Sequence, residues 1–140
     1  IELRECALTV SAHKLVKEIQ RIAIKGVKLL AKNNDFQLVI HVDFAENWIV
    51  LLQNEIQSYH WSKNQISIFT SVCYFGNDKT VSYVTVSDDI KHDSSHALMT
   101  INLIIDNLKQ KHIAQDLDEI ITISDGAASH FKNRYQFYEL

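Results

Sequence analysis

The sequence predicts an α/β domain in which a mixed β-sheet is covered by helices. Residues 36–44 and 119–124 are short apolar runs rich in β-branched residues, which is typical of buried strands. Residues 66–75 and 80–87 flank a short Gly-Asn-Asp turn and predict an antiparallel hairpin. An amphipathic stretch at 96–112 lies between this hairpin and the last strand. A helix in that place is a crossover, so we expect the last strand to run parallel to an earlier one.

The first helix is expected over residues 12–32, because apolar residues recur there at spacings of three and four. The Asn33-Asn34-Asp35 cluster should end this helix. The apolar positions are Leu15, Val16, Ile19, Ile22, Ala23, Val27 and Leu30.

Three further segments complete the expected chain path. Residues 48–52 are predicted to return along residues 36–44 as the second strand of a hairpin, with Ala45, Glu46 and Asn47 as its turn. Residues 53–64 are polar and predict an irregular excursion, and residues 88–95 predict a polar loop. The last residues, 130–140, resemble the start of another helix.

Composition narrows the class of protein. The chain has 140 residues, of which 46% are hydrophobic and 22% are charged, as in globular domains. We expect no membrane association, because no apolar run is long enough to span a bilayer. Cys6 and Cys73 are far apart, which excludes a disulfide framework and a four-cysteine zinc site and suits a reducing interior such as the cytosol or nucleus.

Charge divides the chain into two regions. Residues 1–32 contain seven basic and three acidic residues, whereas residues 33–140 contain seven basic and fourteen acidic residues. We therefore expect a basic amphipathic helical arm over residues 1–35 and a core over residues 36–140. A basic arm on an acidic body favours nucleic-acid contact by the arm and metal binding by the body.

Two predicted strands end in an aspartate after an apolar run. These are Asp43 in LVIHVD and Asp125 in IITISD. Ligands of open α/β sheets bind at the carboxyl ends of strands, and two neighbouring carboxylates are stabilised by a cation between them. Hard oxygen ligands favour Mg²⁺ or Mn²⁺. The alternative is that each aspartate only caps a helix or forms a turn.

Four segments, in order along the chain, resemble the catalytic core of DDE-type transposases, a group of transposon-derived eukaryotic proteins. They are VDFAEN (42–47), EIQSYHW (55–61), SDDIKHD (87–93) and ISDGAASHFKN (123–133). The resemblance implies a ribonuclease H-like fold whose first strand and later parallel strand present catalytic aspartates, here Asp43 and Asp125. It further implies two-metal cleavage and transfer of DNA strands, with DNA as partner and a nuclear or cytoplasmic location.

The resemblance also implies a third acidic residue on a later helix. The sequence ends fifteen residues after Asp125, and Glu139 lies too close to it to match that expected spacing. We therefore expect a core truncated at its C-terminus, or a decayed copy. A catalytically inactive nucleic-acid-binding or relic domain is the alternative function.

Several residues near these motifs are weaker candidates. Glu46 and Asn47 follow Asp43 and would hold metal-bound water or orient that carboxylate, unless they only form a turn. His92, Asp93 and His96 have metal-ligand chemistry, but the same run suits a helix start capped by Asp93 or a neighbouring serine.

The segment after Asp125 offers candidates for substrate contact. Gly126 allows a sharp turn and leaves room for a substrate backbone. Lys132 and Asn133 would contact phosphate, unless they belong to an ordinary solvated helix face. The aromatic cluster Tyr59-His60-Trp61 would stack on an unpaired base, unless it packs on the sheet edge.

Two other phosphate or metal families fit less well. A von Willebrand A-like binding module requires D-x-S-x-S after the first strand, and a haloacid-dehalogenase-like phosphatase requires D-x-D. The chain has Asp-Phe-Ala-Glu-Asn at residues 43–47, which lacks both serines and the second aspartate.

Overall fold

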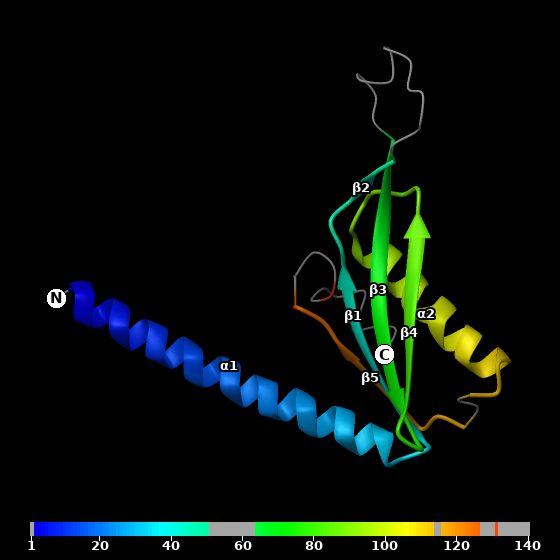
Figure 1. Cartoon of the computed structure of the whole chain (residues 1–140), viewed down its shortest axis with the longest axis horizontal. Coiled ribbons are helices and arrows are strands. Elements are labelled where there is room, and N and C mark those ends of the chain that lie inside the picture. Colours follow the sequence, from blue (N-terminus) through cyan, green and yellow to red (C-terminus); the bar gives the residue numbers. More distant parts are fainter. Residues whose placement is uncertain (1, 51–63, 114–115, 127–130, 132–140) are drawn as a thin grey trace, which may run out of the picture.

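The computed structural model describes residues 2–50, 64–113, 116–126 and 131, and it shows a mixed α/β protein. The elements are α1 (Glu2–Lys32), β1 (Gln37–Phe44), β2 (Trp48–Ile49), β3 (Gln65–Phe75), β4 (Lys79–Ser87), α2 (Ser94–Gln110) and β5 (Glu119–Ile123). In Figure 1 α2 lies along the sheet, whereas α1 projects from one end of it.

The sheet is mixed, as the sequence predicts. Strand β1 lies between β3 and β5, and β4 pairs with the other edge of β3. The β1–β3 and β3–β4 pairs are antiparallel, whereas β5 runs parallel to β1 after the α2 crossover. The expected strand at 119–124 and its parallel pairing are therefore confirmed.

The predicted hairpin between residues 36–44 and 48–52 is wrong. Strand β2 pairs with β3 and not with β1, so it continues the direction of β1 along the same neighbour. Between the pairs Phe44↔Phe69 and Trp48↔Ile66, the segment that joins β1 to β2 covers four residue steps, whereas β3 covers three. This shift is a bulge-like interruption, because the long β3 offers one continuous edge to both short strands.

Helix α1 ends where the sequence predicts but begins earlier. It runs from Glu2, ten residues before the expected start at position 12. Its C-terminal end is joined to the β3–β4 turn by an ion pair of 2.7 Å between Lys32 Nζ and Asp78 Oδ1. The Gly76 of that turn has no room for a side chain, since an added Cβ would lie 1.8 Å from Asp35 Oδ1.

The hydrophobic core lies between α2 and one face of the sheet. Side chains alternate along a strand, so Leu38, Ile40 and Val42 of β1 face α2. They pack with Ile101 and Leu108 of that helix. Val39 and His41 consequently lie on the opposite face, toward α1, and Asp43 belongs to the same row.

The remaining expectations concern a membrane span and the structure of two segments. Among the described helices, none is long and apolar enough to cross a membrane. The polar excursion expected at 53–64 and the helix expected from residue 130 fall almost entirely outside the described residues.

Candidate metal and phosphate site

The parallel pairing of β1 and β5 aligns Asp43 with Asp125. The last parallel pair is His41↔Ile123; Asp43 lies two residues later within β1, and Asp125 lies two residues later in the segment just beyond β5. Asp43 lies in the same row as His41, on the α1 side of the sheet, and Asp125 lines the same cavity as Gln20 and Ile24 of α1. Both aspartates are exposed.

A cavity of about 650 Å³ is lined by both carboxylates and by residues of helix α1. Asp43 and His41 line it from β1, and Asp125 and Gly126 line it beyond the end of β5. Gln20 and Ile24 of α1 form part of its wall. The cavity therefore lies at the carboxyl ends of two parallel strands, the usual position of ligand sites in open α/β sheets.

Gly126 turns the chain directly after Asp125. Its φ angle is 77°, in the left-handed region where residues with a Cβ are strained. Its amide nitrogen donates to Ser124 Oγ at 3.3 Å, which closes the turn around the carboxylate. Gly126 therefore has, directly after Asp125, a backbone conformation that favours glycine.

His41, which sequence reasoning missed, is held beside Asp43 by Lys28. The Lys28 ammonium lies 2.9 Å from His41 Nδ1 and donates to the Tyr74 hydroxyl at 3.3 Å. It also lies 4.6 Å from the centre of the Tyr74 ring. Burial and the Lys28 charge lower the pKa of His41, while the nearby Asp43 charge opposes this shift.

This arrangement favours a neutral imidazole that accepts from Lys28 through Nδ1. One signal in the sequence points to His41, because it is a polar residue within a buried apolar strand and two positions before Asp43. Its partner Lys28 comes from a separate element and carries no such signal.

The oxygen donors of the cavity suit a hard divalent cation with few protein ligands. Mg²⁺ is commonly bound by one or two carboxylates together with water and substrate phosphates. Across the part of the chain that the structure describes, no group of three His, Cys, Asp or Glu side chains is arranged to hold a metal. The described donor set is therefore the Asp43–Asp125 pair.

Residues 20–140 match a family model described as Domain of unknown function (DUF8701). The chain belongs to the DUF8701 family. A search of curated proteins gave no match. In this DUF8701 chain, the family match includes both aspartates and the part of α1 that lines the cavity.

The other sequence candidates of the DUF8701 chain that the structure describes lie outside the wall of this cavity. Asp93 is the N-cap of α2, and its Oδ1 accepts from the His96 amide at 2.9 Å. His92 stacks on Phe44 with ring centres 4.4 Å apart, and His96 contacts the same ring edge to face at 5.3 Å. Phe44 packs against the core on the α2 side, so the structure supports the capping interpretation of this run.

Glu46 and Asn47 follow the end of β1. Asn47 donates from Nδ2 to the Ile90 carbonyl at 3.3 Å, which ties this segment to the loop before α2. Neither residue is part of the cavity wall. Lys132, Asn133 and the aromatic cluster at 59–61 lie outside the described residues.

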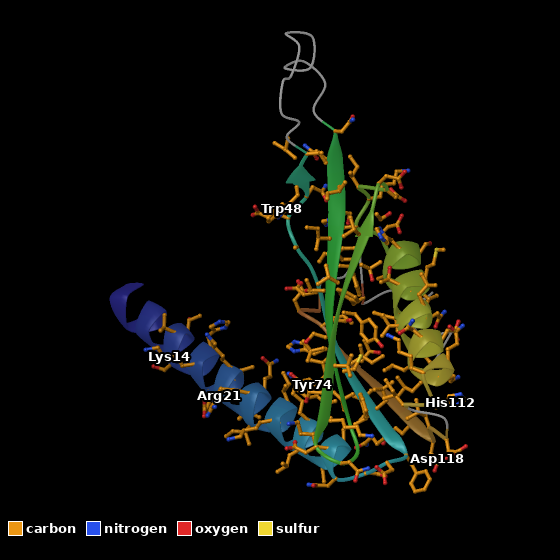
Figure 2. The ribbon with its side chains drawn as sticks, turned by 45° about the vertical axis from the view of Figure 1, so that its right-hand side comes forward. Lys14, Arg21, Trp48, Tyr74, His112 and Asp118 are labelled. Atoms are coloured by element: carbon orange, nitrogen blue, oxygen red, sulfur yellow. The ribbon has the colours of Figure 1, made fainter. Side chains whose placement is uncertain are left out.

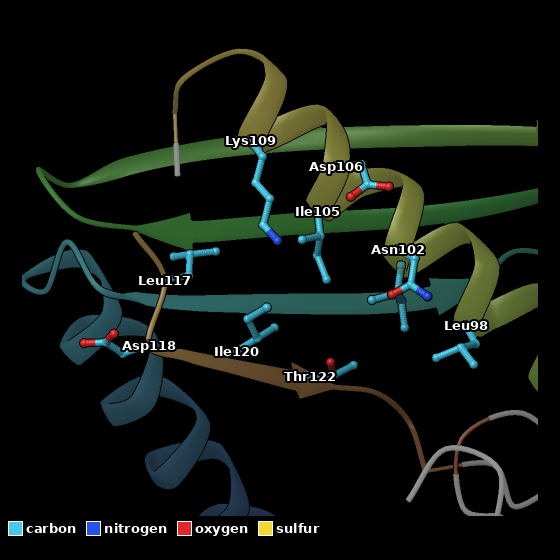
Figure 3. A pocket seen from close by; sticks show the side chains of 10 residues that line it. Leu98, Asn102, Ile105, Asp106, Lys109, Leu117, Asp118, Ile120 and Thr122 are labelled. Carbon is cyan, nitrogen blue, oxygen red and sulfur yellow. The ribbon is translucent and has the colours of Figure 1, made fainter. Parts of the chain in front are cut away.

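A second cavity of about 550 Å³ lies between α2 and β5 (Figure 3). Asp106 and Lys109 of α2 line it together with Asp118, Ile120 and Thr122. Two carboxylates share this wall with a lysine, but they come from a helix and a loop and are not aligned by strand pairing. Asp43 and Asp125, the pair that the sequence indicates, line the first cavity and not this one.

Proposed function

We propose that this DUF8701 chain is the core of a metal-dependent polynucleotidyl transferase, similar to DDE-type transposases. The observation that carries the proposal is the alignment of Asp43 and Asp125. Asp43 near the end of β1 and Asp125 just beyond the end of the neighbouring parallel strand β5 line the wall of one cavity.

The chain path supports a ribonuclease H-like fold. Such a fold presents its catalytic aspartates on the first strand and on a later strand parallel to it. Here β1 is first, two antiparallel strands extend the sheet on one side, and β5 joins the other side after a crossover helix.

Charge on α1 supports a polyanionic substrate. Lys14, Arg21 and Lys28 follow one another at intervals of seven residues, so they lie on nearly the same side of the helix. Lys28 faces His41 at the cavity. Lys14 and Arg21 lie on the projecting part of α1 (Figure 2), and Arg21 also pairs with Glu18 of the same helix. A DNA backbone following this side of the helix would be positioned by phosphate contacts.

Each residue has a separate task in this proposal. Asp43 and Asp125 hold Mg²⁺ or Mn²⁺, which when bound polarises a phosphodiester and activates the attacking water or hydroxyl. Gly126 leaves the cavity open for a nucleic-acid backbone. His41, fixed by Lys28 and Tyr74, orients the wall beside Asp43, and Gln20 closes the cavity from α1.

The test combines Mn²⁺ titration by calorimetry with a cleavage assay on a labelled DNA duplex. We expect Asp43→Asn and Asp125→Asn each to weaken Mn²⁺ binding by tenfold or more and to abolish cleavage. Asp106→Asn, the same chemical change in the second cavity, is the matched control and should retain wild-type binding. A wild-type chain that neither binds Mn²⁺ nor cleaves DNA would refute the catalytic proposal.

A second candidate is a nucleic-acid-binding domain without catalysis. This candidate is favoured because, among the described residues, no third His, Cys, Asp or Glu side chain is grouped with the two aspartates to hold a metal. This candidate predicts salt-dependent DNA binding that Asp43→Asn leaves unchanged, with no cleavage in Mn²⁺. The duplex assay distinguishes the two candidates directly.

A further inference from the structure

Helix α1 exposes a continuous apolar stripe. Six large side chains on it are between 51% and 64% exposed. Exposed apolar surface of this extent commonly marks an interaction site. The six are Leu15, Val16, Ile19, Ile22, Leu29 and Leu30.

The sheet of the same chain contacts a different side of α1. Ala31 is fully buried, Ile24 and Val27 are partly buried, and Lys28 reaches His41 and Tyr74. Helical geometry places these positions opposite Ile19, Ile22 and Leu29. The helix therefore has one side for its own sheet and a second apolar side facing away from it.

The exposed stripe has the repeat of a coiled coil. Leu15, Ile19, Ile22, Gly26 and Leu29 follow one another at alternating spacings of four and three residues. This is the 3.5-residue repeat that keeps an apolar seam facing a partner helix. A helix packed only on a globular core has no need of this second seam.

One antiparallel register makes the stripe complementary to itself. When Ile19 of one copy faces Ile22 of another, Leu15 faces Gly26 and Leu29 faces Ala12. In the two layers beside the central isoleucine pair, a large side chain then meets a small one, which allows close packing. Gly26 offers the space, since an added Cβ there would meet nothing within 4 Å in the single chain.

The same register pairs opposite charges at the edge of the seam. Glu18, which pairs with Arg21 of its own helix at 2.6 Å in the single chain, also lies beside Lys25 of the other copy in this register, and the two-fold symmetry repeats this contact. A parallel arrangement would place Glu18 beside Ala23 and Lys25 beside Leu30, with no such pairs. We infer that α1 is a dimerisation arm that pairs antiparallel with α1 of a second copy of this chain.

The test uses the full chain and measures its mass by sedimentation across micromolar concentrations. We expect a wild-type dimer. Glu18→Lys and Lys25→Glu should each weaken it roughly tenfold, because like charges replace both attractive pairs. Lys17→Glu makes the same charge change on the far side of the helix and should keep the wild-type mass. Circular dichroism verifies that each variant is folded.

Mixing the two weakened variants decides the orientation. One partner then has lysine at both positions and the other has glutamate at both, so antiparallel pairing predicts a restored heterodimer. A monomeric wild type would overturn the inference, and so would a monomer that binds anionic lipid vesicles through α1. The inference would also be overturned if neither substitution weakened the dimer, or if the mixed variants formed no heterodimer.

Discussion

Gly126 is the residue whose backbone conformation most directly shapes the candidate site. Its φ of 77° is unfavourable for any residue with a Cβ, so Gly126→Ala should lower the free energy of unfolding by about 1–2 kcal/mol. Urea denaturation measures this change. Gly126→Asn is the matched variant and should cost less, because asparagine tolerates the left-handed region. Equal losses in both variants would show that space, and not φ, limits this position.

Cys73 offers a prediction about pH at the same scale. Burial raises the pKa of the Cys73 thiol to about 12, so the folded chain favours the protonated form. The unfolded thiol ionises near pH 8.5, and stability should therefore be lost as the pH rises above that value. The expected slope is about 1.4 kcal/mol per pH unit until the folded pKa is reached.

Denaturation between pH 7 and 11 in a Cys6→Ser background checks this slope. The Cys73→Ala variant is the control and should lack the thiol contribution, whatever its starting stability. In the folded protein at pH 8, Cys73 should also resist alkylation. Rapid alkylation without unfolding would contradict the burial argument.

The residues of the site differ in how well sequence reasoning finds them. Asp43 and Asp125 are found because each follows a buried apolar run, so position along one strand is sufficient. The contact of Lys28 with His41 and Tyr74 joins three elements. These three residues share no local sequence pattern, because only folding brings them together.

At the scale of elements, the start of α2 depends on Asp93. Its carboxylate accepts from the His96 amide, which satisfies one of the unpaired donors at the helix N-terminus. Asp93→Ala should lower the free energy of unfolding by about 1 kcal/mol in urea denaturation. Asp88→Ala, in the exposed loop before this helix, is the control and should change stability little.

The capping role of Asp93 also predicts how its substitution affects metal affinity. Because Asp93 lies outside the wall of the Asp43–Asp125 cavity, Asp93→Ala should leave Mn²⁺ affinity unchanged. A loss of Mn²⁺ affinity with unchanged stability would instead assign Asp93 to the site.

The strands show where local patterns are sufficient and where they are not. Strand β1 is largely buried, whereas β5 is only partly buried, and the crossover helix between them determines their parallel pairing. Strand β2 was expected to pair with β1 because the two are close in sequence. The eleven residues of β3 provide a longer alternating surface, and both β1 and β2 pair with it instead.

At the scale of the whole molecule, the cavity concentrates negative charge in a chain whose net charge is already −3. Asp43 and Asp125 line that cavity, and two carboxylates that share one site repel each other when no cation lies between them. Asp43→Asn should therefore leave the free energy of unfolding unchanged or raise it slightly. Thermal denaturation in EDTA measures this difference.

Saturating Mn²⁺ should reverse the order of the two proteins. A ligand that binds only the folded state at 100 times its Kd adds about 2.7 kcal/mol of stability, and wild type should gain most of this while Asp43→Asn gains little. Asp106→Asn should gain as much as wild type, because its carboxylate lines the other cavity. If Asp43→Asn unfolded the chain without metal, the Asp43 carboxylate would be a structural group. The two aspartates would then stabilise the fold by their own hydrogen bonds and not serve to hold a cation.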